Sequence, residues 1–296
     1  MTVRDLDTAF TSHCQHITPE GVVVDDHGIL ITGASGTLGS RLVRSLAAHG
    51  VQPRALVRTR EKADQVAPFA TPINGDLLAP KSLEAAFRDV ERVFILGQPT
   101  ADMEVLERNA IDAAVAAGVR RIVYMSNFTA LVGSALRPNH IHGVHEGLIA
   151  SLGIEWTVLG PTRYMTNMPF DWPSVLQDSL LHEGGGGGTM TCIDPDDVAA
   201  IAAKVLTEEG HHGQTYKLTS NDAFTAAELA ELLGARIGHV VTVADDTPIG
   251  GYFELVAAGS YHTTDTAERL LGRVPRAYAH WLDEHLPRIR SELKPS

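Results

Sequence analysis

Cysteine is nearly absent from this chain of 296 residues, which contains only Cys14 and Cys192. Two thiols so far apart supply neither a disulfide framework nor the short spacings of a zinc site. The sequence therefore excludes a small disulfide-stabilised secreted domain, and it fits a reducing compartment.

Long apolar runs and a basic N-terminus are also missing. No stretch approaches the roughly 20 apolar residues that a membrane helix needs. The first residues, MTVRDLDTAF, lack the basic start and the apolar core of a signal peptide. We therefore expect a soluble, cytoplasmic protein.

Positive charge is in deficit, with 24 Lys and Arg residues against 36 Asp and Glu residues and a formal net charge of −12. A surface this acidic repels phosphate backbones and anionic lipids. We expect no nucleic-acid partner and no membrane partner. The length allows one large domain, or a large domain with a smaller one.

From Gly28 onward, short β-rich runs alternate with helical stretches. Ile29–Thr32 is apolar without alternation, which suits a strand buried on both faces. Further strands are expected at Arg54–Val57, Pro72–Asn74, Arg92–Leu96, Arg121–Met125 and Trp156–Leu159. Strands that alternate with helices pair in parallel through right-handed crossovers. The pattern predicts an α/β fold, a doubly wound parallel sheet of the Rossmann type.

The pattern changes after residue 160. Gly184–Gly188 is a run of five glycines, which predicts a flexible loop or a lid. Thr215–Leu218 is a candidate for a strand that returns to the sheet, and Asp265–Leu293 is helical with breaks at Pro275 and Pro287. We divide the chain into an N-terminal extension (1–27), a Rossmann domain (28–160) and a smaller, mostly helical substrate-binding region (161–296) that partly returns to the sheet.

A glycine-rich segment follows the first strand. Gly33 permits a tight turn, Gly36 lets the backbone approach a pyrophosphate, and Gly39 lets the helix pack closely on the sheet. The helix that begins there offers N–H groups and a partial positive charge to phosphates. This context predicts a dinucleotide-binding loop rather than a glycine turn without a ligand. The expected contacts are Gly33, Ser35, Gly36, Thr37, Leu38 and Gly39.

The residues after the second strand indicate which dinucleotide is bound. An NAD site usually places Asp or Glu there, to hold the ribose 2′-hydroxyl. This sequence has Arg58, followed by Arg60 and Lys62. Arg58 can form a forked contact with a 2′-phosphate and Lys62 can add charge, although such bases can also be solvated at a helix start. The sequence therefore predicts NADP(H).

Contacts with the rest of the cofactor are expected where later strands end, because ligands of open α/β sheets bind at that edge. Asp76 and Leu77 follow the third strand, where an acid commonly contacts the adenine. Gly97 follows the fourth strand, and we expect its missing side chain to let the chain pass close to the cofactor. Pro161 follows the sixth strand, near the expected nicotinamide.

Several segments resemble the NmrA-like atypical short-chain dehydrogenase/reductases, in particular the quinone-reductase-like branch. The segments are Leu56-Val57-Arg58, Gly75-Asp76-Leu77, Val93-Phe94-Ile95, Ser151–Thr157, Asp197-Val198-Ala199 and Gly213–Tyr216. They occur in order over about residues 28–286. The resemblance implies a Rossmann domain, a preference for NADP(H), and reduction of quinones, azo or triarylmethane dyes. The family also includes members that only sense the cofactor and bind a regulatory protein.

The resemblance fails at the catalytic residues. Reductases of the family with a full set use Tyr, then Lys four residues on, then Glu or a similar residue four further on; the Tyr donates a proton to the carbonyl oxygen. Counting back from Glu146 places His142 at the Lys position and Pro138 at the Tyr position. The usual carbonyl-reductase mechanism is therefore not encoded. Ser126 is retained, whereas Gly160 stands where the family usually has an arginine.

A quinone tolerates this loss, because hydride addition gives a stabilised hydroquinone anion that water or a histidine can protonate. His142 and Ser126 are the candidate catalytic residues, with His142 near the nicotinamide ribose; the alternative is a solvated histidine at a helix start. Tyr164, Met165 and Phe128 are the candidates to stack on a flat aromatic substrate, and packing between the domains is the alternative.

The function predicted from the sequence is an NADPH-dependent oxidoreductase of a quinone-like or polycyclic aromatic small molecule. We expect no metal, because the spacing of His140, His142 and His145 scatters them around a helix. The alternatives are a non-catalytic NADP(H) redox sensor that binds a protein partner, and a non-redox isomerase or cyclase on the same fold. The sequence leaves a homodimer open.

Overall fold

The computed structural model describes residues 15–17, 23–25, 28–169, 171–183, 187–244 and 251–293. Residues 184–186 of the predicted glycine loop lie outside these ranges, as does most of the predicted N-terminal extension. Within that extension, Gln15–Ile17 (β1) and Val23–Asp25 (β2) form an antiparallel pair.

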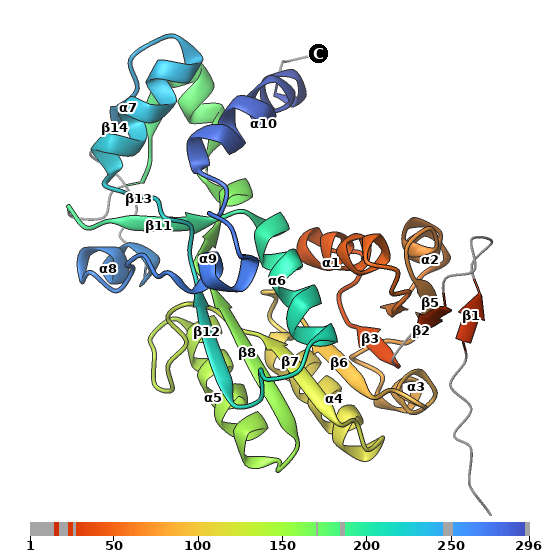
Figure 1. Ribbon diagram of the computed structural model, residues 1–296. Coiled ribbons are helices and arrows are strands. Elements are labelled where there is room, and N and C mark those ends of the chain that lie inside the picture. Colours follow the sequence, from red (N-terminus) through yellow and green to blue (C-terminus); the bar gives the residue numbers. More distant parts are fainter. Residues whose placement is uncertain are drawn as a thin grey trace, which may run out of the picture.

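A seven-stranded sheet forms the centre of the molecule (Figure 1). Its strands are β3 (Ile29–Ile31), β4 (Arg54–Val57), β5 (Thr71–Asn74), β6 (Arg92–Ile95), β7 (Arg121–Met125), β8 (Glu155–Pro161) and β12 (Gln214–Leu218). All are parallel, in the order β12-β8-β7-β6-β3-β4-β5. The order reverses between β3 and β6, where sheets of this kind bind ligands. The predicted doubly wound Rossmann sheet is confirmed.

Helices cover both faces of this sheet (Figure 1). They are α1 (Thr37–Ala48), α2 (Arg60–Val66), α3 (Pro80–Ala86), α4 (Met103–Ala116), α5 (Arg137–Ser151) and α6 (Pro195–Thr207). Ile29 and Ile31 pack into the cluster formed with α1 and α6, whereas Leu30 packs into the cluster formed with α3, α4 and α5. Successive side chains of a strand point to opposite faces, so burial on both faces requires the unbroken apolar run.

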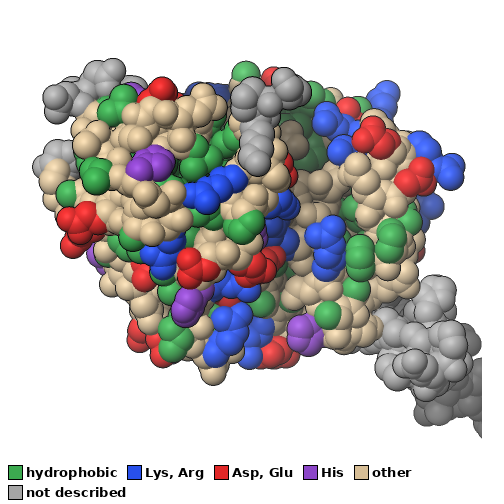
Figure 2. Space-filling view, turned by 90° about the horizontal axis from the view of Figure 1, so that it is seen from above, with side chains coloured by type: hydrophobic (Ala, Val, Ile, Leu, Met, Phe, Trp, Pro, Cys, Tyr) green, Lys and Arg blue, Asp and Glu red, His purple; other side chains and the backbone are tan. Residues whose placement is uncertain are grey.

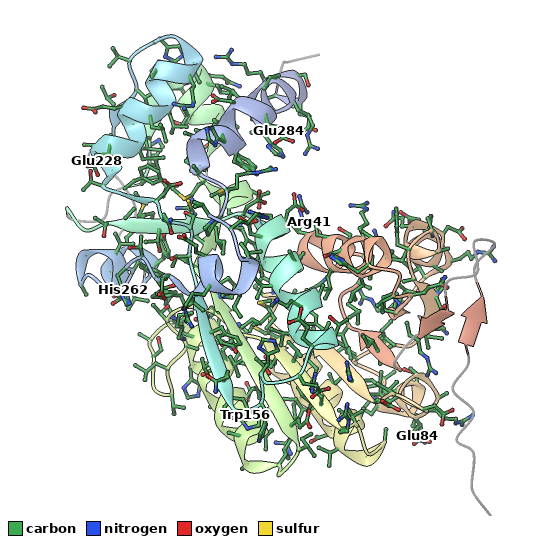
Figure 3. The ribbon with its side chains drawn as sticks, viewed as in Figure 1. Arg41, Glu84, Trp156, Glu228, His262 and Glu284 are labelled. Atoms are coloured by element: carbon green, nitrogen blue, oxygen red, sulfur yellow. The ribbon has the colours of Figure 1, made fainter. Side chains whose placement is uncertain are left out.

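A smaller region covers one end of the sheet. It contains β9 (Arg163–Tyr164), β10 (Leu180–Leu181), β11 (Met190–Ile193), β13 (Ala223–Phe224), α7 (Ala226–Ile237), β14 (Thr242–Val243), α8 (Gly251–Ala257) and α10 (Tyr278–Glu292). Its core includes Met165, Leu229, Tyr278 and Trp281. In Figure 3, Trp156 marks the end where β8 begins and Arg41, on α1, marks the opposite end. The smaller region therefore lies beyond the carboxyl ends of the strands.

The chain returns to the large sheet after residue 160. α6 packs against α1, β12 pairs with β8, and α9 (Thr266–Leu271) packs against α6. The chain after residue 160 therefore contributes both to the large sheet and to the smaller region. The break expected at Pro287 is absent, because α10 continues through it. The buried face of that helix includes Trp281 and Leu286. It packs on the core of the smaller region, and this packing supports the helix across the proline.

Candidate active site

The turn between β3 and α1 needs its glycines. Gly33 has a φ of +62°, the left-handed region that favours glycine. A Cβ on Gly39 would lie 2.2 Å from the carbonyl oxygen of Gly33, so a larger residue would push the helix off the strand. The first turn of α1, which the structure describes completely, has no side-chain cap and no acidic residue. The N–H groups of Thr37 and Leu38 are therefore available to phosphate oxygens.

A cleft of about 290 Å³ opens beside this turn, at the ends of β4 and β5. The predicted cofactor residues that line it are Gly33, Ser35, Arg58, Lys62, Asp76 and Leu77. One carboxylate oxygen of Asp76 accepts the N–H of Leu78 at 3.0 Å. Figure 2, which views the molecule from above, shows Lys and Arg side chains interspersed with Asp and Glu on this face. The cleft therefore combines a phosphate loop with basic side chains.

The three bases that follow β4 differ in their surroundings. Nε of Arg60 lies 2.9 Å from a carboxylate oxygen of Asp64, and Arg60 does not line the cleft. Nζ of Lys62 donates to the side-chain oxygen of Gln65 at 3.2 Å. Arg58 is exposed, lines the cleft and has no ion-pair or hydrogen-bond partner among the described residues. Arg58 is therefore the side chain best placed to meet a phosphate.

Gly97, which follows β6, lies against a buried carboxyl group. A Cβ at this position would lie 2.3 Å from Oε1 of Glu107, a fully buried residue of α4. We expected the glycine to admit the cofactor. In the structure, glycine is required here by the close contact with the Glu107 carboxyl group, and the cofactor contact stays a prediction.

Glu107 belongs to a buried polar network on the α5 side of the sheet. Its Oε2 accepts the Tyr124 hydroxyl proton at 2.6 Å and the Nδ1 proton of His145 at 2.8 Å. The Tyr124 oxygen also lies 2.8 Å from Nδ1 of His142. Because the tyrosine proton points to Glu107, Nδ1 of His142 must be the donor to the tyrosine oxygen. The lone pair of the neutral imidazole is therefore on Nε2.

His142 is buried, with 9% of its surface exposed. Burial lowers the pKa of His142, and the nearby Glu107 opposes this shift without cancelling it. The ring is therefore neutral near pH 7. The alternative interpretation, a solvated histidine at a helix start, is wrong, because the ring is enclosed and hydrogen-bonded to Tyr124.

Ser126 directly follows β7, on the same side of the sheet as this network. Its hydroxyl donates to Oε1 of Glu146 on α5. The next residue, Asn127, accepts a hydrogen bond from Nζ of Lys217 at 3.2 Å through its carbonyl oxygen. Burial lowers the pKa of Lys217, while the carboxylate of Glu146 acts in the opposite direction. Ser126, Glu146 and Lys217 thus lie beside the ends of β7 and β8, where the charge of Lys217 also acts on His142. Pro161 ends β8 there, and its carbonyl oxygen accepts the N–H of Phe128 at 2.9 Å.

The three predicted substrate residues do not form one surface. Phe128 is buried and stacks on Tyr261, with ring centroids 5.9 Å apart. Tyr164 packs against the cluster of α1 and α6, with its hydroxyl 4.0 Å from the sulfur of Met125. Met165 is 0% exposed within the core of the smaller region. The predicted stacking of Met165 on a substrate is wrong, because its side chain fills that core. Of the other aromatic candidates, Trp172 packs against the same core and Phe170 lies outside the described residues.

The three histidines of α5 have different hydrogen-bond partners and do not form one cluster. Nδ1 of His140 accepts the N–H of Gly133 at 2.8 Å, away from the contacts of His142 and His145. Among the described residues, no group of three or more His, Cys, Asp and Glu side chains is arranged to hold a metal ion. No helix in the described part of the chain is long and apolar enough to cross a membrane.

Three residues of the site were not predicted from the sequence: Glu107, Tyr124 and Lys217. Glu107 leaves a signal, because it interrupts the buried stripe of α4 between Met103 and Ala110. A buried acid on an apolar helix face needs a partner. Lys217 leaves none, because only the pairing of β12 with β8 brings it to the site.

A glycine-rich turn at the switch point of a parallel sheet, beside a cleft that Arg58 lines, defines a Rossmann-type dinucleotide-binding protein. Residues 33–209 match the model of the NAD(P)H-binding family, and the chain belongs to this family. The predicted family and the predicted nicotinamide cofactor are confirmed.

Three relatives are informative. The chain is similar to the NAD(P)H azoreductase of Xenophilus azovorans, with 31% identity over 72% of this chain and 75% of that protein. It is 32% identical to quinone oxidoreductase 2 of Escherichia coli, over 72% of this chain and 76% of the relative. The NADPH complex of that quinone oxidoreductase has a TM-score of 0.80 and covers 87% of this chain and 99% of that chain. The NADP(H) complex of triphenylmethane reductase from Citrobacter sp. has 28% identity and a TM-score of 0.72, covering 85% of this chain and 98% of that chain.

Proposed function

We propose that this protein is an NADPH-dependent oxidoreductase that reduces quinone-like or polycyclic aromatic small molecules. The names of its relatives describe reductases of azo compounds, quinones and triphenylmethane dyes, which are conjugated acceptors. The observation that carries the cofactor choice is Arg58, an exposed cation in the cleft at the position where NAD sites carry an acid.

The residues of the cleft fit NADPH. The N–H groups at the start of α1 would hold the pyrophosphate, with Gly33, Gly36 and Gly39 giving the backbone room and Ser35 lining the cleft. Arg58 and Lys62 would hold the 2′-phosphate, and Asp76 and Leu77 would lie at the adenosine. Ser126, His142 and Pro161 would lie near the nicotinamide. Bound NADPH would supply the hydride.

His142 would handle the proton. Its Nδ1 is held by Tyr124, which leaves the Nε2 lone pair to take a proton from water and pass it to the reduced acceptor. The residue at the position of the family's tyrosine is Pro138, which has no proton to donate. The proposed mechanism therefore lacks the Tyr/Lys pair and suits acceptors whose reduced form is already a stabilised anion.

The test is oxidation of NADPH by the purified full chain with a panel of quinones and aromatic ketones, with NADH run in parallel. We expect turnover with quinones, a preference for NADPH, and loss of that preference in Arg58→Ala. Arg60→Ala is the matched control, because Arg60 pairs with Asp64 outside the cleft. Tight cofactor binding without turnover on any acceptor would overturn the reductase and favour a redox sensor.

A further inference from the structure

Lys217 reaches the site across a glycine. β12 pairs with β8 so that Lys217 lies opposite Gly160. A Cβ at Gly160 would lie 3.2 Å from Cδ of Lys217 and 2.9 Å from the carbonyl oxygen of Asn127. The aliphatic part of the lysine therefore covers the space that a side chain at position 160 would fill. This path directs the ammonium group toward the end of β7.

The ammonium group lies among the polar residues already described. Nζ donates to the carbonyl oxygen of Asn127 at 3.2 Å and lies 5.9 Å from the centroid of the Phe128 ring. Its charge interacts with the Glu146 carboxylate. It also lowers the pKa of His142, although burial and the neighbouring His145 lower that pKa more. Lys217 is therefore a cation of the candidate active site and not a surface lysine.

Ser126 and His142 already use their protons in hydrogen bonds within the protein. The Ser126 hydroxyl donates to Glu146, and the Nδ1 proton of His142 points to Tyr124. Neutral His142 then presents only a lone pair at Nε2. An ammonium group has three N–H donors, and one of them is used on Asn127 among the described residues. Lys217 therefore retains both donor capacity and positive charge.

We propose that Lys217 binds the oxygen of the acceptor that becomes negative during reduction. This inference rests on the proposed function. A quinone that accepts a hydride gains two electrons and one hydrogen, while the dihydronicotinamide is oxidised, and the product is a hydroquinone monoanion. Lys217 holds the phenolate oxygen of this anion by a charge-assisted hydrogen bond, and a proton from water then completes the hydroquinone. Lys217 itself loses no proton.

Because the charge develops only during reduction, removal of the ammonium group should lower kcat more than it raises the KM of the neutral quinone. We expect a loss of kcat of about 10- to 100-fold in Lys217→Met, the range of a hydrogen bond to a charged group. Lys217→Arg restores a cation and should recover part of the loss. Lys81→Met is the matched control, because Lys81 is exposed on α3.

A binding measurement separates this role from a structural one. 4-Nitrophenol is a phenol whose ionised form absorbs visible light, so the pKa of the bound probe can be read directly. The full chain, with and without NADP⁺, should lower the pKa of the bound 4-nitrophenol, because the ammonium group favours the phenolate. Lys217→Met should abolish the shift, and Lys217→Arg and Lys81→Met should keep it.

The outcomes are distinct. If the wild type reduces quinones and Lys217→Met retains its kcat within twofold, the role of Lys217 is overturned and the proposed function stands. If kcat falls but the pKa of bound 4-nitrophenol is the same as in wild type, the lysine has only a structural role. If the wild type reduces no acceptor, the proposed function fails. The 4-nitrophenol shift and its loss in Lys217→Met then still decide whether Lys217 binds phenolates.

Discussion

Replacing Tyr124 by phenylalanine tests whether the buried network orients His142. The tyrosine is completely buried, and its hydroxyl donates to Glu107 at 2.6 Å and accepts from His142 at 2.8 Å. Phenylalanine keeps the ring and removes only the oxygen. The change therefore isolates the two hydrogen bonds from the packing of the side chain.

The expected loss of stability in Tyr124→Phe follows from the hydrogen bonds that remain in the network. A hydrogen bond to a charged group contributes about 1.5–3 kcal/mol, and a buried group left unsatisfied costs about 1–3 kcal/mol. Glu107 keeps its bond to His145 at 2.8 Å, whereas Nδ1 of His142 loses its hydrogen-bond partner. We expect the free energy of unfolding to fall by about 2–4 kcal/mol. We also expect kcat for quinones to fall about tenfold, because the imidazole is no longer held in one tautomer.

Denaturant unfolding followed by circular dichroism measures the first effect, and NADPH oxidation measures the second. Tyr216→Phe is the matched control. Its hydroxyl contacts Nδ1 of His211 at 2.9 Å at a half-buried position, so the loss should stay below about 1 kcal/mol. If Tyr124→Phe unfolds within about 0.5 kcal/mol of the wild type, the hydroxyl does not hold the network and the reasoning is refuted.

Three further predictions concern the cofactor loop, the cofactor choice and the pH dependence of stability. Gly39→Ala should abolish detectable NADPH binding in calorimetry, because its Cβ would lie 2.2 Å from the Gly33 oxygen; Gly147→Ala, in open space on α5, should bind normally. Arg58→Ala should raise the KM for NADPH about 10- to 100-fold and leave the KM for NADH unchanged; equal changes for both would contradict the 2′-phosphate contact. Burial lowers the pKa of His142 below its usual 6.5, so the unfolded chain binds its proton more readily. This contribution to stability is complete above about pH 6.5 and is lost as the pH falls through the lower folded pKa, so denaturation midpoints should fall on acidification. The fall should be shallower in His142→Gln, and an equally steep fall in that variant would count against a buried neutral imidazole.

The elements that could be predicted are those encoded by neighbouring residues. The apolar run Ile29–Ile31 marks a strand buried on both faces, and the glycine spacing from Gly33 to Gly39 marks the turn and the start of α1. Arg58 follows β4 directly, so its position at the carboxyl edge follows once the strand is identified. Each of these predictions depends on a strand and on the turn or residue that immediately follows it.

The sequence by itself therefore determined the layers of the fold, the phosphate loop and the class of cofactor. Three contacts were decided by the tertiary structure alone. Glu107 lies against Gly97, Met165 is buried in the core of the smaller region, and Lys217 reaches the end of β7. These contacts join residues on different elements, and strand pairing and helix packing, which set their distances, depend on the whole chain. A lysine in a short edge strand looks the same in sequence whether it faces water or, as Lys217 does, covers a glycine on the next strand.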